Sequence, residues 1–312
     1  MEVIKLTTPW DHNYKHQIPI PLKSKYIFEI NNDCDEADYW FVWGAVREKE
    51  VVSVAHENTF FIVEEAFKER QYKQSFLNQF KHVITCRDDI KHLGLIKHHD
   101  LGIWYFNKCY EELMALENIE KSKKISVVSS DLTWLEGHKK RYAFVNKLIG
   151  HFKDRIDVYG KGFNYIEDKF DALYPYRYSV AIENNSLKNY FTEKIFECYL
   201  TYTVPIYYGC VNISDYFSSE SFAHIDINDY KGSINKIERL IDDDALYQQY
   251  TQTILKEREK VFNQYHIFAS LDKIIQNNKS NLQNKKKTIV LYPEFGSSYL
   301  AKIKQIVKNI SS

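Results

Sequence analysis

The chain has no excess of charge of either sign and few cysteines. Its 42 lysine and arginine residues balance 42 aspartate and glutamate residues, so the formal net charge is zero. Proteins that bind nucleic acid through its phosphates carry a basic balance or a basic stripe, and this composition argues against that class. The five cysteines are odd in number, scattered and without CxxC spacing, which predicts reduced thiols and no zinc site.

Long apolar runs are missing as well. The first ten residues, MEVIKLTTPW, do not show a basic segment followed by an apolar one, so no secretory signal is expected. The apolar stretch 39–46 is far shorter than the ~20 residues that cross a bilayer. With 312 residues, the chain is long enough for one large or two medium domains. We therefore expect a soluble enzyme of the cytoplasm.

The most informative segment runs from residue 178 to 209 and reads YSVAIENNSLKNYFTEKIFECYLTYTVPIYYG. Its pattern predicts a buried strand, a polar turn, a helix with Thr192 as the N-cap, and a second strand. The polar residues gather only where strand meets helix. In open α/β sheets this is the place where phosphate-bearing ligands bind. The segment therefore predicts a nucleotide-sugar site.

Strand and helix patterns alternate along the whole chain, which predicts an α/β fold of two βαβ series. The predicted strands are 2–6, 25–30, 39–43, 59–63, 81–85, 125–129, 156–159, 177–182, 204–208 and 223–227. The predicted helices are 69–80, 108–116, 138–152 and 192–200, with helical spacing again over 235–276. The charged stretch 120–124 is the best candidate for a linker between the two series.

The sequence resembles a known family over most of its second half. The run EN-N-S…Y-x-TEK-I…VPIYYG resembles the donor-binding signature of the α1,3/α1,4-fucosyltransferases, glycosyltransferase family ten. Upstream, 137–141 and 157–162 are similar to the family's basic helix start and glycine turn. Downstream, 212–217 and 222–226 are similar to its next helix and strand. Such an ordered set of matches is much more specific than TEK alone.

The resemblance implies the GT-B arrangement, in which two Rossmann-like domains face a central cleft. We accordingly expect an acceptor-binding domain at 1–122, a GDP-sugar-binding domain at 123–276 and a basic tail at 277–312. Animal members of the family usually carry a membrane anchor. Its absence here, with the Lys-, Asn- and Ile-rich composition, favours a bacterial-type cytoplasmic enzyme.

Two cations are expected to hold the diphosphate. Lys194 lies in the first turn of a predicted helix, where the helix dipole disfavours a cation unless an anion joins it. Arg141 follows the predicted strand 125–129, and its planar guanidinium suits bidentate contact with phosphate oxygens. By resemblance Arg141 carries the family's diphosphate contact. An ordinary surface lysine and a solvated basic helix face are the alternatives.

The resemblance also implies the other donor-binding residues. Glu193 matches the residue that bonds the ribose hydroxyls, and Glu183, Asn184 and Tyr190 match positions that line the donor pocket. Glu183 has an equally weighted alternative, which is to cap or brace the loop. The pair Gly160 and Gly162, with Lys161 between them, lacks a third glycine, so the dinucleotide fingerprint is absent. We interpret this segment as a tight turn near the nucleotide.

An inverting sugar transfer needs a base on the sugar face opposite the diphosphate. The predicted strand 59–63 ends in Glu64 and Glu65, and family members carry a catalytic glutamate after the equivalent strand. Aligned on that strand, Glu65 takes this place, but Glu64 stands where the family has glycine, so either carboxylate remains a candidate. An acid pair that favours a helix dipole is the alternative.

Two acidic motifs resemble metal-binding DxD sequences. Asp33-Cys34-Asp35 lies in an Asn/Asp-rich turn, and Asp242-Asp243-Asp244 lies between two helical patterns, where it predicts a helix terminus and an N-cap. We therefore expect no metal requirement. In the tail, 299–308 reads as a basic amphipathic helix, which favours either peripheral contact with the inner membrane or packing on the first domain.

Together with these patterns, the resemblance implies an inverting fucosyltransferase that moves L-fucose from GDP-fucose to a glycan hydroxyl, in a surface polysaccharide or lipopolysaccharide. One alternative keeps the fold and uses a different GDP-sugar. Another is a glycan- or nucleotide-binding relative that has lost its base.

Overall fold

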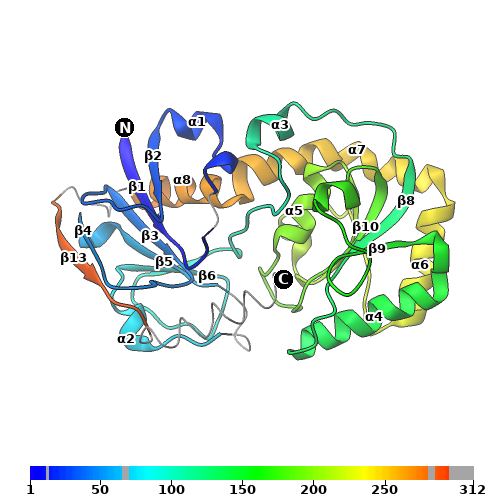
Figure 1. Ribbon diagram of the computed structural model, residues 1–312, viewed down its shortest axis with the longest axis horizontal. Helices are drawn as coiled ribbons and strands as arrows, with labels where there is room; N and C mark the ends of the chain where they lie inside the picture. Colours follow the sequence, from blue (N-terminus) through cyan, green and yellow to red (C-terminus); the bar gives the residue numbers. More distant parts are fainter. Residues whose placement is uncertain (12–13, 65–69, 280–284, 295–312) are drawn as a thin grey trace. The chain divides into compact units, whose positions relative to one another are not determined.

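The computed structural model describes residues 1–11, 14–64, 70–279 and 285–294 (Figure 1). The chain folds as two compact units, one built from 1–98 and the segment that starts at residue 271, the other from 99–270. The passages between units thus fall at 98/99 and 270/271 and not at the predicted 122/123 and 276/277. The acceptor-binding and donor-binding roles of the domains stay predictions.

The first unit is built on a six-stranded parallel sheet with the order β2-β1-β3-β5-β6-β7. Its strands are β1 (Glu2–Thr7), β2 (Tyr26–Ile30), β3 (Tyr39–Trp43), β5 (Thr59–Ile62), β6 (His82–Thr85) and β7 (Leu95–Lys97). Two one-turn helices accompany them, α1 (Ile20–Lys23) and α2 (Gln74–Leu77). Every residue of β3, β5 and β6 is buried, as expected for central strands covered on both faces.

A second, antiparallel sheet in this unit pairs β4 (Glu50–Val54) with β13 (Lys287–Leu291). Val52, Val54 and Leu291 from these strands join the core of the first unit. The sequence pattern missed both strands, because each finds its partner more than 230 residues away. Part of the predicted tail is therefore a strand of the first unit, while the predicted helix 299–308 lies outside the described residues.

The second unit is built on a five-stranded parallel sheet with the order β12-β11-β10-β8-β9. Its strands are β8 (Lys123–Val128), β9 (Asp157–Tyr159), β10 (Tyr176–Ile182), β11 (Val204–Tyr208) and β12 (Ala223–His224). Its helices are α3 (Tyr110–Met114), α4 (Glu136–Phe152), α5 (Glu193–Leu200), α6 (Tyr230–Asp242) and α7 (Asp244–Lys260). Helix α8 (Ile267–Asn278) follows and ends in the first unit.

Side chains of β10 alternate between two layers of core. Val180 and Ile182 pack in the cluster that holds the buried faces of α4 and α6. Ala181, between them, packs in the cluster that holds α5. This alternation follows from the two-residue period of a strand. Helices therefore cover both faces of the second sheet, which confirms the predicted α/β class.

Most predicted elements are confirmed, and β3 and β11 match to the residue. Of the predicted helix 69–80, the structure forms only the one-turn helix α2 within the described residues 70–80. Its buried side chains are Phe76 and Leu77. Asp243 caps α7 by accepting a bond from the Leu246 amide, as predicted for the acidic run 242–244. No disulfide joins any of the five cysteines.

The predicted linker 120–124 is wrong. Lys121 is buried, and its Nζ donates to the carbonyl oxygens of Tyr174 (2.6 Å) and Thr201 (2.7 Å). Burial lowers the pKa of Lys121 to about 7. These contacts pack the segment that carries Lys121 into the second unit. In a solvated linker the ammonium group would lie in water and its pKa would not be lowered.

Candidate functional site

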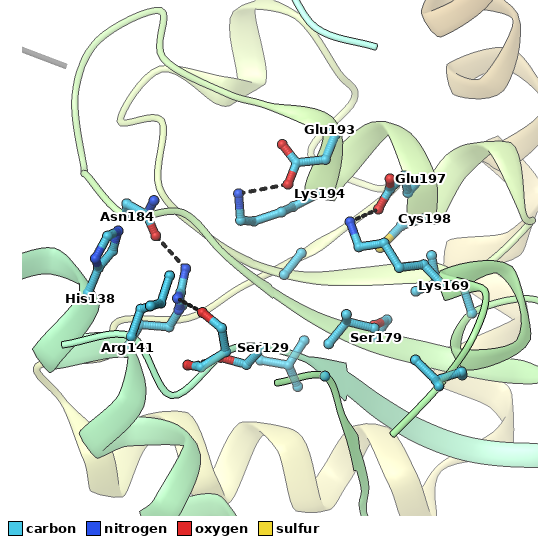
Figure 2. Close-up of a pocket in the computed structure, with 18 residues that line it drawn as sticks. Ser129, His138, Arg141, Lys169, Ser179, Asn184, Glu193, Lys194, Glu197 and Cys198 are labelled. Carbon is cyan, nitrogen blue, oxygen red and sulfur yellow. Dashed lines mark hydrogen bonds and ion pairs between the residues drawn. The ribbon is translucent and has the colours of Figure 1, made fainter. Parts of the chain in front are cut away.

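A cavity of about 420 Å³ opens at the carboxyl edge of the second sheet (Figure 2). In the sheet, β9 lies on one side of β8. The next strand in sequence, β10, lies on the other side of β8, and β11 follows beyond β10. The order of the strands therefore reverses between β8 and β10. Ser129 and Ser130 directly follow β8, Asn184 follows β10, and all three line the cavity. Ligands of open α/β sheets bind at such a switch point.

Two helices begin at this cavity without a side-chain cap. The N-cap residues are Leu135 for α4 and Thr192 for α5, and neither makes a side-chain cap hydrogen bond. In contrast, α6 and α7 are capped by Asp229 and Asp243. The first-turn amides and the positive end of each helix dipole therefore favour an anion at the cavity.

The expected capping role of the Thr192 hydroxyl is wrong. Its Oγ1 donates to Glu183 Oε2 (2.7 Å), and its backbone N–H donates to the other oxygen of that carboxylate (2.8 Å). The hydroxyl is directed away from the helix because Glu183 is a fully buried carboxylate that needs donors. Glu183 thereby braces the start of α5.

Lys194 is the central cation of the site. Its Nζ lies 3.2 Å from Glu183 Oε2. It also lies 3.0 Å from Glu193 Oε1 (Figure 2). Burial acts to lower the pKa of Lys194, but these two carboxylates outweigh it and raise the pKa above its usual range. The anion that a lysine at a helix start requires is thus supplied by the protein itself. With 21 % of the side chain exposed, Lys194 faces the cavity as a fixed positive charge.

Glu193 lines the cavity beside Lys194. Burial would raise its pKa, but Lys194 and then Lys169 lower it to about 2, so this carboxylate is charged at neutral pH. A carboxylate in this state accepts hydrogen bonds from a diol such as ribose.

Arg141 is the second cation, and α4 presents it from the opposite side of the cavity (Figure 2). The side chain is buried, and its guanidinium donates to Asn184 Oδ1 and to Ser130 Oγ (2.9 Å). Both partners are loop residues at the carboxyl ends of strands. The planar group is therefore held in one orientation, which suits phosphate oxygens.

The structure brings five of the predicted donor-site residues to the cavity and leaves three outside its lining. The five are Arg141, Lys194, Glu193, Asn184 and Gly160. Glu183 lies beneath them as a brace, Tyr190 is buried, and Lys161 is exposed on the turn after β9. Glu183 is buried and accepts both the N–H and the hydroxyl of Thr192, which agrees with the bracing alternative.

The cavity also contains charged and polar residues that the sequence did not single out. They are Ser129, Ser130, His138, Lys169, Ser179 and Glu197. The position of Glu197, four residues after Glu193 on one helix face, was a readable signal. Lys169 gave none, because its approach to Glu197 depends on how the segment before β10 folds.

A close approach at Gly137 holds α4 against the loop after β10. A Cβ placed on Gly137 would lie 1.7 Å from the carbonyl oxygen of Asn184. Only glycine lets the first turn of α4 come this near. That turn carries His138, and Arg141 lies in the next turn of the same helix. The shape of the cavity therefore depends on this glycine.

We expect Gly137→Ala to destabilise the protein by about 1–3 kcal/mol, because the added methyl group must displace the Asn184 loop. Gly150→Ala is the matched control, since it lies in the same helix with no atom within 4 Å of the added Cβ. That control should stabilise by about 0.5–1 kcal/mol. Urea denaturation measures both. Equal effects of the two substitutions would contradict the steric role of Gly137.

In the first unit, Glu64 lies just past β5. Its Oε1 accepts a hydrogen bond from Trp10 Nε1 (3.0 Å), and Tyr72 bonds its backbone. Burial raises the pKa of Glu64, while Arg70 and the Trp10 bond oppose the shift. The neighbouring Glu65 lies outside the described residues. A carboxylate with a raised pKa is compatible with a general base. The catalytic role and the choice between Glu64 and Glu65 stay predictions.

Comparison with known proteins shows the family of this chain. The family model described as "Glycosyltransferase family 10 (fucosyltransferase) C-term" matches residues 119–290, which is more than half of the chain. The chain belongs to glycosyltransferase family 10. All the cavity residues described above lie within the matched range.

Curated relatives of this family 10 chain agree with the match. It is 26 % identical over 175 residues to alpha-(1,3)-fucosyltransferase B of Drosophila melanogaster, covering 47 % of this chain and 38 % of that protein. It is 33 % identical over 70 residues to alpha-(1,3)-fucosyltransferase FucT of Helicobacter pylori, covering 22 % and 14 %. The matches thus span well under two thirds of these relatives.

Solved structures share the fold of this family 10 chain. An alpha1,3-fucosyltransferase with GDP superposes with a TM-score of 0.53 at 17 % identity, covering 85 % of this chain and 93 % of that one. A second alpha1,3-fucosyltransferase structure gives 0.53 at 17 %, covering 91 % and 90 %. These likenesses confirm the predicted GT-B fold class. The facing of two domains across a cleft stays a prediction.

The sequence argued against a metal site and against a membrane-spanning helix, and the structure bears on both. Among the described residues, no three His, Cys, Asp or Glu side chains lie close enough together to hold a metal ion. In the same part of the chain, no helix has the length and apolarity needed to cross a membrane. Metal independence and the cellular location stay predictions.

Proposed function

We propose that this protein transfers L-fucose from GDP-fucose to a hydroxyl group of a glycan, with inversion at the anomeric carbon. The observation that carries the proposal is the convergence of two cations and two uncapped helix starts at the switch point of the sheet, in a family 10 chain. The solved relative that contains GDP supports a guanosine diphosphate ligand.

The residues of the cavity have separate roles in this proposal. Lys194 and Arg141, with the amides at the two helix starts, stabilise the charge that develops on the departing diphosphate. Glu193 accepts from the ribose hydroxyls, and Asn184 orients Arg141.

The chemical step moves one sugar and one proton. The acceptor oxygen attacks the anomeric carbon as the bond from that carbon to the diphosphate oxygen breaks, and GDP leaves. A carboxylate, Glu65 or Glu64, takes the proton of the attacking hydroxyl. The products are GDP and a fucosylated glycan of inverted configuration. We further propose a surface polysaccharide or lipopolysaccharide as acceptor, a reaction in the cytoplasm and no metal requirement.

A ligand panel tests the proposal. Calorimetry and melting temperatures compare GDP-fucose, GDP-mannose, GDP, UDP-glucose and UDP-galactose, because a ligand of the native state raises the melting temperature. We expect GDP-fucose to bind best and to yield GDP when a glycan acceptor is added. Preference for GDP-mannose would point to another GDP-sugar as donor. Binding of UDP-sugars alone, or of none, would sink the fucosyltransferase assignment.

The environment of Glu64 predicts a pH effect that separates the two candidate bases. A base acts in its charged form, so kcat/KM rises with pH through the base's pKa. The Trp10 bond lowers the pKa of Glu64 against the effect of burial. In Trp10→Phe that bond is lost, the pKa rises further, and the acid limb of the profile should move to higher pH. A pH–rate profile of the variant against Trp134→Phe, an exposed tryptophan, measures this.

An unmoved acid limb in Trp10→Phe, with activity intact, would exclude Glu64 as the base and leave Glu65 as the candidate to test. Loss of the acid limb altogether would show that neither glutamate titrates in the rate-limiting step.

A further inference from the structure

The cavity contains a second fixed ion pair, which none of the roles above uses. Lys169 Nζ lies 2.7 Å from Glu197 Oε2, and Glu197 Oε1 accepts the backbone N–H of Tyr105 (2.7 Å). The Glu197 side chain is 3 % exposed, whereas 27 % of the Lys169 side chain is exposed. Both residues line the cavity (Figure 2). Glu197 is thus the buried anchor, and Lys169 is the member that presents N–H groups to a ligand.

This pair lies away from the diphosphate-binding groups. Figure 2 shows Arg141 and Asn184 on one side of the cavity and Lys169 with Glu197 on the other, with Lys194 and Glu193 between them. Along α5, Glu197 follows Glu193 by four residues, which is about 6 Å further from the helix start. A nucleotide with its diphosphate at the helix start and its ribose at Glu193 would therefore extend its base toward Lys169.

The cavity lining beside Lys169 and Glu197 includes apolar side chains that could contact the flat ring of a nucleotide base. Ile166 and Leu173 line the cavity from the segment that also carries Lys169, and Ala181 and Cys198 line it from β10 and α5. These side chains offer apolar contact to the faces of a base. Lys169 is then the charged donor available at its edge.

We propose that Lys169, anchored by Glu197, selects the base of the nucleotide by donating to the O6 and N7 acceptors of guanine. This inference rests on the proposed function. Lysine pairs with this edge of guanine because both atoms accept hydrogen bonds. Adenine places an N6 amino group where guanine has O6, so the ammonium would face a donor there and adenine nucleotides are rejected. Glu197 is a positioning residue, since it fixes the ammonium and does not itself touch the base.

The test compares the binding of GDP, IDP and ADP by calorimetry. IDP keeps O6 and N7 but lacks the 2-amino group of guanine, so the protein should bind IDP and GDP within about threefold of each other. It should bind ADP at least tenfold more weakly, which is the size expected for one good edge contact. In Lys169→Met the preference for GDP over ADP should collapse to less than about threefold.

Lys169→Met leaves Glu197 buried without its cation and could unfold the protein. The double variant Lys169→Met with Glu197→Gln removes both charges and keeps an acceptor for the Tyr105 amide. Its melting temperature reports folding, and its GDP-to-ADP ratio should also collapse. Lys188→Met, an exposed lysine outside the cavity lining, is the charge-matched control and should keep the ratio of the parent.

The outcomes separate this inference from the function on which it rests. If the parent binds no nucleoside diphosphate, the proposed function fails. If the parent prefers GDP and the variants keep that preference, or lose GDP and ADP affinity equally, then Lys169 does not read the base and only this inference is overturned. A parent that binds ADP as tightly as GDP overturns it as well.

Discussion

Replacing both Glu64 and Glu65 by glutamine is expected to lower kcat by 10²–10⁴-fold, the usual contribution of a general base, while GDP binding is unchanged. The change removes the two candidate carboxylates that come first after β5 in the sequence. Glutamine is preferred to alanine because at position 64 it keeps an acceptor for Trp10 Nε1. Steady-state kinetics measure the loss, and calorimetry with GDP shows that the donor site is intact.

The single variants identify the base, since only one of them should reproduce the loss. Glu48→Gln, an exposed acid of the same unit, is the control and should retain the parental rate. A double variant as active as the parent would show that the base lies elsewhere. A parent that binds donor and acceptor yet turns over no GDP-sugar would identify a binding protein without catalysis.

Replacing Lys194 by alanine should have the second large effect. Removing one preorganised charge from the leaving group typically costs 10²–10³-fold in rate, about 3–4 kcal/mol. We expect kcat/KM to fall by this factor and GDP affinity to fall as well. Guanosine, which has no phosphate, should bind the variant as it binds the parent. Calorimetry with both ligands isolates the phosphate contribution.

Lys194 also neutralises Glu183, so the alanine variant should be less stable. Removing one partner of a buried ion pair typically costs about 3–5 kcal/mol, and partial exposure of Lys194 reduces that figure here. Glu183→Gln with Lys194→Ala removes both charges and should recover much of the stability but none of the GDP affinity. Lys188→Ala is the surface control. Recovery of GDP affinity in the double variant would mean that Lys194 acts only as a structural brace.

The sequence predicted the cationic half of the candidate site. Lys194 and Arg141 each follow a strand pattern and open a helix pattern, and this local order places them at one edge of a parallel sheet. The same reasoning placed Thr192 correctly as the N-cap residue of α5 but misassigned the bond of its hydroxyl, since a hydroxyl at a helix start normally caps the helix. The competing partner, Glu183, is nine residues away, and its burial is a property of the folded sheet.

The different roles of the acidic residues of the site became clear only from the structure. Glu183 and Glu193 are neighbours of the same signature, yet one braces α5 from below and the other faces the cavity. Sequence spacing does not distinguish them, because the difference arises from which side of the loop packs against Thr192. The pairing of Lys169 with Glu197 joins residues 28 apart and has no local signature.

By itself the sequence determined the α/β class, nearly every central strand, the family and the edge of the second sheet where a phosphate would bind. These features depend on short-range periodicity and on helix starts, which a chain encodes within a few residues. Only the tertiary structure decided the division into units, the β4–β13 pair and the arrangement of charges in the cavity. Each of these is settled by contacts between distant segments, whose partners are chosen by burial and by the pairing of buried charges.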